Sequence, residues 1–129
     1  MTKRILISAP YFQPVLGEYL PVFEQYDLEP VVPKVTERLE EHELLSIIQD
    51  IDGAICGDDR FSSTVLDAAT RLSVISKWGT GIDSIDQEYA NKKNIKIFNT
   101  PNAFTKPVSD TVIGYILTFA RQLHAMDMD

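Results

Sequence analysis

The residue types and spacing best suited to chemistry occur in the run KWGTGID at residues 77–83, directly after a short apolar segment. Gly79 and Gly81 flank Thr80, and two glycines so spaced allow a tight turn whose amides point outward. Such a loop can hold a carboxylate or a phosphate with backbone N–H groups alone. A tight turn without any ligand is the alternative interpretation of the same spacing.

The run is not the dinucleotide-binding fingerprint. That fingerprint is Gly-x-Gly-x-x-Gly and opens the first strand–helix–strand unit of its fold, whereas here the sixth position is Ser84 and the run follows the fourth predicted strand. We therefore take the run as an anion-binding candidate and only a weak indication of a nucleotide.

Other reactive side chains give weaker indications. Asp58 and Asp59 could hold a metal or act as an acid and a base, but adjacent loop residues usually point apart. His42 lies in the charged segment EEHE, which is typical of a solvated helix face, and His124 falls in an apolar segment that favours a packing or interface role. None of these patterns assigns a catalytic or metal-binding residue.

Composition narrows the class of protein. The chain has 129 residues, 44% of them hydrophobic, which suits one globular domain. Its net charge of −7 and its scattered basic residues disfavour nucleic-acid binding. The single cysteine, Cys56, excludes an internal disulfide framework and indicates a small core residue. No apolar run is long enough for a signal peptide or a membrane span, so we expect a cytoplasmic protein without membrane association.

Short β-rich runs alternate with amphipathic segments, which predicts an α/β fold. Five strands joined by single-helix crossovers would form a flavodoxin-like, doubly wound parallel sheet. Strands are predicted at residues 4–8, 29–32, 53–56, 73–77 and 96–99, and helices at 15–26, 40–50, 63–70 and 86–92. Ligands of such sheets bind at the carboxyl ends of the strands, in the loops 9–14, 57–61, 78–83 and 100–105.

The last segment, residues 107–128, predicts a long helix that is apolar around more than half of its circumference. One sheet would not cover so much apolar surface, and no stop signal follows the segment. Two explanations stay open: the chain ends before its folding unit does, or the helix pairs with another subunit.

Several motifs occur in a specific order between residues 72 and 123. An apolar strand leads into G-x-G-x-D-x-x-D, and a helix, a strand ending N-T-P and a final helix opening V-S-D follow. This stretch resembles the D-isomer-specific 2-hydroxyacid dehydrogenases, and within them the phosphoglycerate dehydrogenases in particular. The upstream segment IDGAICGDDRFSSTVLDAATRL is similar to the preceding strand, loop and helix of that family.

The resemblance implies a reversible hydride transfer between NAD and a 2-keto or 2-hydroxy acid. It places the substrate carboxylate on the loop of Gly79, Thr80 and Gly81, chiefly on the amides of the last two, and it places Thr80, Val108 and Asp110 near the cofactor. Residues 1–105 would form the substrate-binding domain and residues 106–129 an interdomain and dimerisation helix. The NAD-binding domain and the catalytic residues would lie outside this chain, which alone would be inactive.

Two departures from the family pattern bear on the substrate. Phosphoglycerate dehydrogenases often carry Arg-Ser for the substrate phosphate where this chain has CGDD at residues 56–59, although Arg60 could reach the site from a shifted loop. Phe104 replaces a common asparagine, and Asp110 keeps the carboxylate of the V-A-E triplet. A self-standing carboxylate-binding or dimerising regulatory module is the alternative function, and a receiver-like signalling domain has only the fold in its favour.

Overall fold

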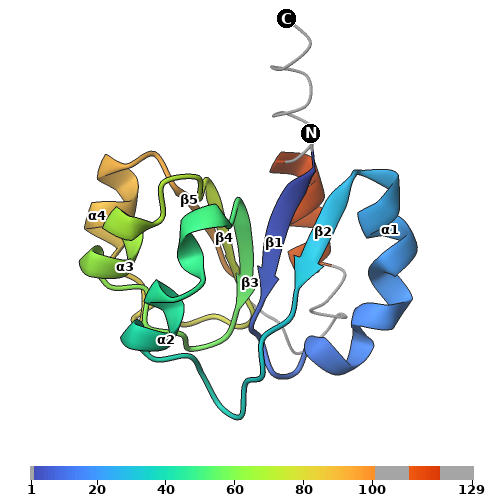
Figure 1. The fold of residues 1–129 in the computed structure, drawn as a ribbon, viewed down its shortest axis with the longest axis horizontal. Coiled ribbons are helices and arrows are strands. Elements are labelled where there is room, and N and C mark those ends of the chain that lie inside the picture. The colour runs from blue at the N-terminus through green and yellow to red at the C-terminus, as the bar shows by residue number, and fades with distance from the viewer. Residues whose placement is uncertain (1, 101–110, 120–129) are drawn as a thin grey trace, which may run out of the picture.

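Five parallel strands form one sheet in the computed structural model, which describes residues 2–100 and 111–119 (Figure 1). The strand order is β2-β1-β3-β4-β5, the flavodoxin-like order, so the predicted fold class is confirmed. The strands are β1 (Lys3–Ile7), β2 (Leu28–Val31), β3 (Gly53–Cys56), β4 (Val74–Lys77) and β5 (Lys96–Phe98). The order reverses between β1 and β3, and this reversal is where ligands of such sheets bind.

Each crossover contains helical structure, but two of the predicted helices are broken. The predicted helix 15–26 is a 3-10 helix, Gln13–Tyr19, followed by α1 (Leu20–Gln25). Pro21 lies in the first turn of α1 and has no N–H to donate, so one continuous α-helical ladder cannot pass through it. The predicted helix 40–50 divides into α2 (Glu41–Leu45) and a short 3-10 helix, Ile48–Asp50.

The other two crossover helices each begin at a side-chain cap. Ser62 accepts a hydrogen bond from the N–H of Val65 at the start of α3 (Ser63–Ala68). Asp86 accepts from the N–H of Tyr89 at the start of α4 (Gln87–Lys92). Each cap satisfies one of the free N–H groups of a first helical turn, which fixes where the helix begins.

Helices cover both faces of the sheet. In Figure 1, α2, α3 and α4 lie on one side, and α1 and the helical residues 111–119 lie on the other. Side chains alternate between the two faces along each strand: in β1, Leu6 packs beneath α2–α4 while Ile5 and Ile7 pack on the opposite side. Burial on both faces explains why these strands are almost continuously apolar.

The described part of the final helix, residues 111–119, packs against the sheet. Val112, Ile113 and Ile116 are buried, and Tyr115 stacks on Phe98 of β5 with ring centroids 4.8 Å apart. The large exposed hydrophobic residues of the described chain lie elsewhere, at Tyr11, Leu20 and Val32. The predicted surplus of apolar surface is therefore not found on residues 111–119, and pairing of two chains through this helix stays a prediction. No helix among the described residues is long and apolar enough to cross a membrane.

Candidate functional site

The glycine loop that follows β4 is held by the residues that follow β5. Gly79 has a φ of +127°, a conformation that side chains rarely tolerate, so this turn requires glycine. Its N–H donates to the hydroxyl oxygen of Thr100 at 3.0 Å, and its carbonyl accepts from the N–H of Thr100 at 2.8 Å. Gly79 therefore serves the turn, and its own amide is occupied within the protein.

A second bond fixes the next peptide of the loop. The side-chain amide of Asn99 donates to the carbonyl of Thr80 at 2.9 Å. The N–H groups of Thr80 and Gly81 have no acceptor among the described residues, and both residues are exposed. An anion arriving at this loop would meet two free donors on a backbone that is already positioned.

Asn99 and Thr100 hold the candidate loop in place, a role that the sequence patterns did not predict. Both residues belong to the N-T-P motif, which contributed only to the family resemblance. A pattern of residue types could not show that the two side chains reach across from β5 to the loop after β4. Only the pairing of β4 with β5 brings them together.

A cleft of about 490 Å³ opens beside this loop, at the carboxyl ends of β1, β3 and β4. It therefore lies at the reversal of strand order, which is where the doubly wound topology predicts a ligand. The residues that line it are Ala9, Pro10, Tyr11, Thr36, Glu37, Gly57, Asp58, Lys77 and Trp78.

An ion pair between Lys77 and Asp58 occupies one wall of the cleft. The Nζ of Lys77 lies 2.7 Å from Oδ1 of Asp58, and the lysine side chain is only 6% exposed while the aspartate is 72% exposed. The hydrogen bond from Lys77 lowers the pKa of Asp58, so this carboxylate keeps its charge at neutral pH. A Cβ on Gly79 would lie 3.7 Å from the same Nζ, which places the ammonium directly beside the glycine loop.

Asp59 points in the opposite direction, into the protein. Its fully buried carboxylate accepts hydrogen bonds from the hydroxyl of Ser8 at 2.6 Å and from the N–H groups of Leu39 and Gly57 at 2.5 and 3.1 Å. Burial raises the pKa of Asp59 although these donors favour the charged form. The two aspartates thus point apart, as predicted, and Asp59 ties together the three segments that form the cleft wall.

Gly57, which follows β3 and lines the cleft, has no side chain to extend into it. A Cβ on Gly57 would lie 3.2 Å from Cδ of Pro10, closer than most such contacts, so the two loops meet at a glycine. Arg60 does not line the cleft. It lies at a separate open pocket, where its Nε is 4.0 Å from a carboxylate oxygen of Glu40.

The remaining candidates take no part in this site. His42 is exposed on α2, and Cys56 is fully buried, which raises the pKa of its thiol. Within residues 2–100 and 111–119, no cluster of three or more His, Cys, Asp or Glu residues could hold a metal ion. Phe104, Val108, Asp110 and His124 lie outside the described residues.

Comparisons with known proteins identify the family of the chain. The D-isomer specific 2-hydroxyacid dehydrogenase catalytic domain matches residues 5–123. A D-3-phosphoglycerate dehydrogenase of Sus scrofa is 36% identical over 88 residues, which are 67% of this chain and 16% of that protein. A hydroxypyruvate reductase of Thermotoga maritima is 33% identical over 89 residues, or 68% of this chain and 29% of that protein. The chain thus spans less than a third of the length of these curated relatives.

Solved structures share the fold. The NAD+-bound 3-phosphoglycerate dehydrogenase of Entamoeba histolytica superposes with a TM-score of 0.69 at 23% identity, over 78% of this chain and 33% of that one. An NADPH-dependent glyoxylate/hydroxypyruvate reductase of Sinorhizobium meliloti, in complex with NADP and malonate, superposes with a TM-score of 0.59 at 25% identity. That match covers 91% of this chain and 34% of the reductase chain.

Proposed function

Since this chain belongs to the D-isomer-specific 2-hydroxyacid dehydrogenases, we propose that it is the substrate-binding part of an oxidoreductase that interconverts 2-keto and D-2-hydroxy acids. The observation that carries the proposal is the glycine loop, where the N–H groups of Thr80 and Gly81 have no acceptor among the described residues. The loop directly follows Lys77 and Trp78, which line the cleft at the reversal of strand order.

The loop suits a carboxylate for two physical reasons. Two neighbouring N–H groups can each donate to one carboxylate oxygen, and hydrogen bonds to a charged group contribute about 1.5–3 kcal/mol each. The contacts of Asn99 and Thr100 hold the loop before a ligand arrives, so little ordering is needed on binding.

The proposed cofactor is NAD or NADP, which when bound accepts or supplies the hydride. Thr80 is exposed at the tip of the loop, and we assign it to the cofactor side of the substrate together with Val108 and Asp110. Residues 1–105 would bind substrate, and residues 106–129 would connect them to a separate NAD-binding domain and pair two subunits. That domain would also supply the catalytic residues, so this chain's share is to bind and orient the acid.

The test is a kinetic assay of the protein expressed from its complete gene. Glyoxylate and hydroxypyruvate are offered with NADH or NADPH, and loss of the reduced nicotinamide absorbance is followed. The variant Gly81→Val places a branched side chain where a Cβ meets nothing within 4 Å, so the fold tolerates it while the approach of a carboxylate to the loop is blocked. We expect KM to rise at least about tenfold, which corresponds to the loss of one such hydrogen bond.

Gly17→Val is the matched control, because Gly17 also has open space around its Cβ and does not line the cleft. Unchanged kinetics in Gly81→Val would remove the loop from the mechanism. If the unaltered protein binds 2-keto acids but turns none over with either cofactor, the chain belongs to a carboxylate-binding regulatory module instead.

A further inference from the structure

The charges of the cleft indicate what the far end of the substrate looks like. Among the described residues that line it, Lys77 is the single cation, and it faces two carboxylates, Glu37 and Asp58. Asp58 holds the Lys77 ammonium at 2.7 Å, so the positive charge is already matched within the protein. Glu37 is exposed and adds a further negative charge.

We propose that the Asp58–Lys77 ion pair is a specificity determinant, through which the cleft selects 2-keto acids with an uncharged distal group over those with a distal phosphate. This inference rests on the proposed function, because it takes the substrate carboxylate to lie on the loop of Thr80 and Gly81. The Lys77 ammonium lies beside that loop, since a Cβ on Gly79 would be 3.7 Å from its nitrogen.

A phosphate next to Lys77 would also lie close to Asp58. Like charges within about 4–6 Å repel each other, and the solvent that reaches Asp58 reduces this repulsion without abolishing it. Lys77 cannot turn away to compensate, because its side chain is 6% exposed and its nitrogen lies between Asp58 and the carbonyl of Trp78 at 3.5 Å. A hydroxyl group carries no such penalty and can donate to the exposed carboxylate of Asp58.

The neighbouring arginines do not supply the cleft with an unpaired positive charge that a phosphate could bind. Arg38 and Arg60 both stand near enough to Asp58 to lower its pKa, but their guanidinium groups are directed to Glu40, at 2.9 and 4.0 Å. Neither arginine lines the cleft. Position 57 supplies no basic side chain either, because it is a glycine, and a Cβ there would lie 3.2 Å from Cδ of Pro10.

The experiment compares hydroxypyruvate with 3-phosphohydroxypyruvate as substrates of the protein expressed from its complete gene. We expect kcat/KM to favour hydroxypyruvate by about threefold to fivefold, the effect of one unfavourable charge contact that solvent partly screens. Asp58→Asn frees the ammonium of Lys77, and the ratio of the two kcat/KM values should shift by about the same factor toward the phosphorylated substrate. The shift should arise from KM of the phosphorylated substrate rather than from kcat, because the pair acts on binding.

Glu88→Gln is the control, since it removes an exposed carboxylate of α4 that does not line the cleft, and it should leave the ratio as it is. Inorganic phosphate gives a second readout on the same variants: it should inhibit Asp58→Asn competitively at lower concentration than the unaltered protein. This readout needs no phosphorylated substrate.

Two results would overturn the inference while keeping the proposed function: a preference of the unaltered protein for the phosphorylated substrate, or a ratio and phosphate inhibition that Asp58→Asn leaves unmoved. Turnover of glyoxylate but of neither longer substrate would overturn it as well. Absence of turnover with every 2-keto acid would instead refute the proposed function on which it rests.

Discussion

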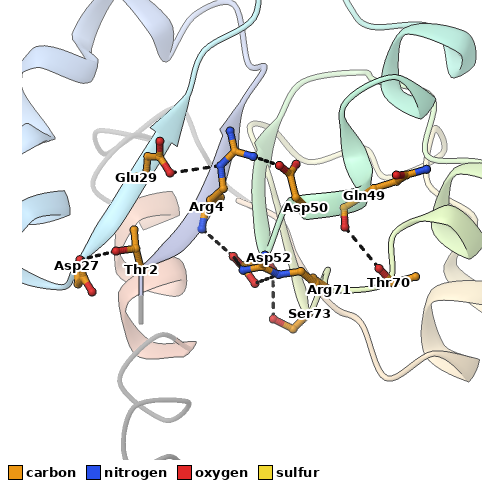
Figure 2. Close-up of polar contacts among 10 residues, drawn as sticks. All are labelled: Thr2, Arg4, Asp27, Glu29, Gln49, Asp50, Asp52, Thr70, Arg71 and Ser73. Carbon is orange, nitrogen blue, oxygen red and sulfur yellow. Dashed lines mark hydrogen bonds and ion pairs between the residues drawn. The ribbon is translucent and has the colours of Figure 1, made fainter.

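Polar groups at the two ends of the sheet differ in whether they have partners within the protein. At the amino ends of the strands, Asp52 is 7% exposed and accepts from the N–H of Arg4 at 2.7 Å and from two nitrogens of Arg71 at 3.2 and 2.9 Å. Figure 2 shows this network, in which Arg4 also reaches Glu29 and Asp50. At the carboxyl ends, Thr80 and Gly81 present N–H groups without an acceptor among the described residues.

The polar groups at the amino ends of the strands stabilise the fold, whereas those at the carboxyl ends are available to a ligand. In the amino-end network of Figure 2, opposite charges pair within the protein: Arg4 with Glu29 and Asp50, and Arg71 with Asp52. At the carboxyl end, the Thr80 and Gly81 donors lack an acceptor among the described residues, and the positive-φ turn requires glycine at position 79. Substitutions at the two ends should therefore have different consequences.

The largest effect on stability is expected from Asp52→Ala at the amino end. The substitution leaves the N–H of Arg4 and the half-exposed guanidinium of Arg71 without their acceptor. We expect the free energy of unfolding to fall by about 2–3 kcal/mol, toward the lower part of the range for buried pairs because Arg71 reaches solvent. Urea denaturation measures the loss. Thr70→Ala, which removes a weak exposed contact at 3.4 Å, should change it by less than about 0.5 kcal/mol.

Gly79→Ala tests the strained turn at the carboxyl end. An alanine at a φ of +127° should destabilise the chain by about 1–3 kcal/mol and displace the loop, so binding of 2-keto acids should also weaken. Gly81→Ala provides the comparison. A Cβ on Gly81 would have no neighbour within 4 Å, and the φ of Gly81 lies outside the positive region that favours glycine. Equal losses of unfolding free energy in the two variants would contradict the assignment of the turn to Gly79.

Thr100→Val should produce a smaller change of the same kind. The variant keeps the shape of the side chain but removes the hydroxyl that bonds to the N–H and the carbonyl of Gly79. We expect a loss of about 1 kcal/mol in unfolding free energy and a raised KM for the 2-keto acid. A loss of stability with an unchanged KM would show that Thr100 does not position the loop for binding.

The smallest effect concerns the pH dependence of Asp58. Its pKa is lowered in the folded chain, so its contribution to stability is present above the ordinary carboxyl pKa and is lost as the pH falls through the lowered value. The contribution should be less than about 1 kcal/mol, because the carboxylate is 72% exposed and solvent screens it. NMR titration of the carboxyl carbon should give a midpoint below that of a model aspartate, and Lys77→Met should bring the midpoint back.

Sequence patterns predicted the strands and the glycine loop better than the helices and the contacts between loops. Strand positions such as Gly53–Cys56 follow from continuous apolar runs, which only burial on both faces explains. The break before Pro21 was missed because apolar spacing continues across it, although the proline itself removes the required donor. The Lys77–Asp58 pair could not be predicted either, since it depends on how β3 and β4 place their ends.

The most direct measurement is a titration of the isotopically labelled chain with hydroxypyruvate, followed through its backbone amide NMR signals. The amide signals of Thr80 and Gly81 should move most with ligand concentration. The signals of Asp52 and Arg71 at the opposite end should stay in place. Shifts centred on the amino-end network, or binding seen by calorimetry with the Thr80 and Gly81 signals unmoved, would contradict the assignment of carboxylate binding to the glycine loop.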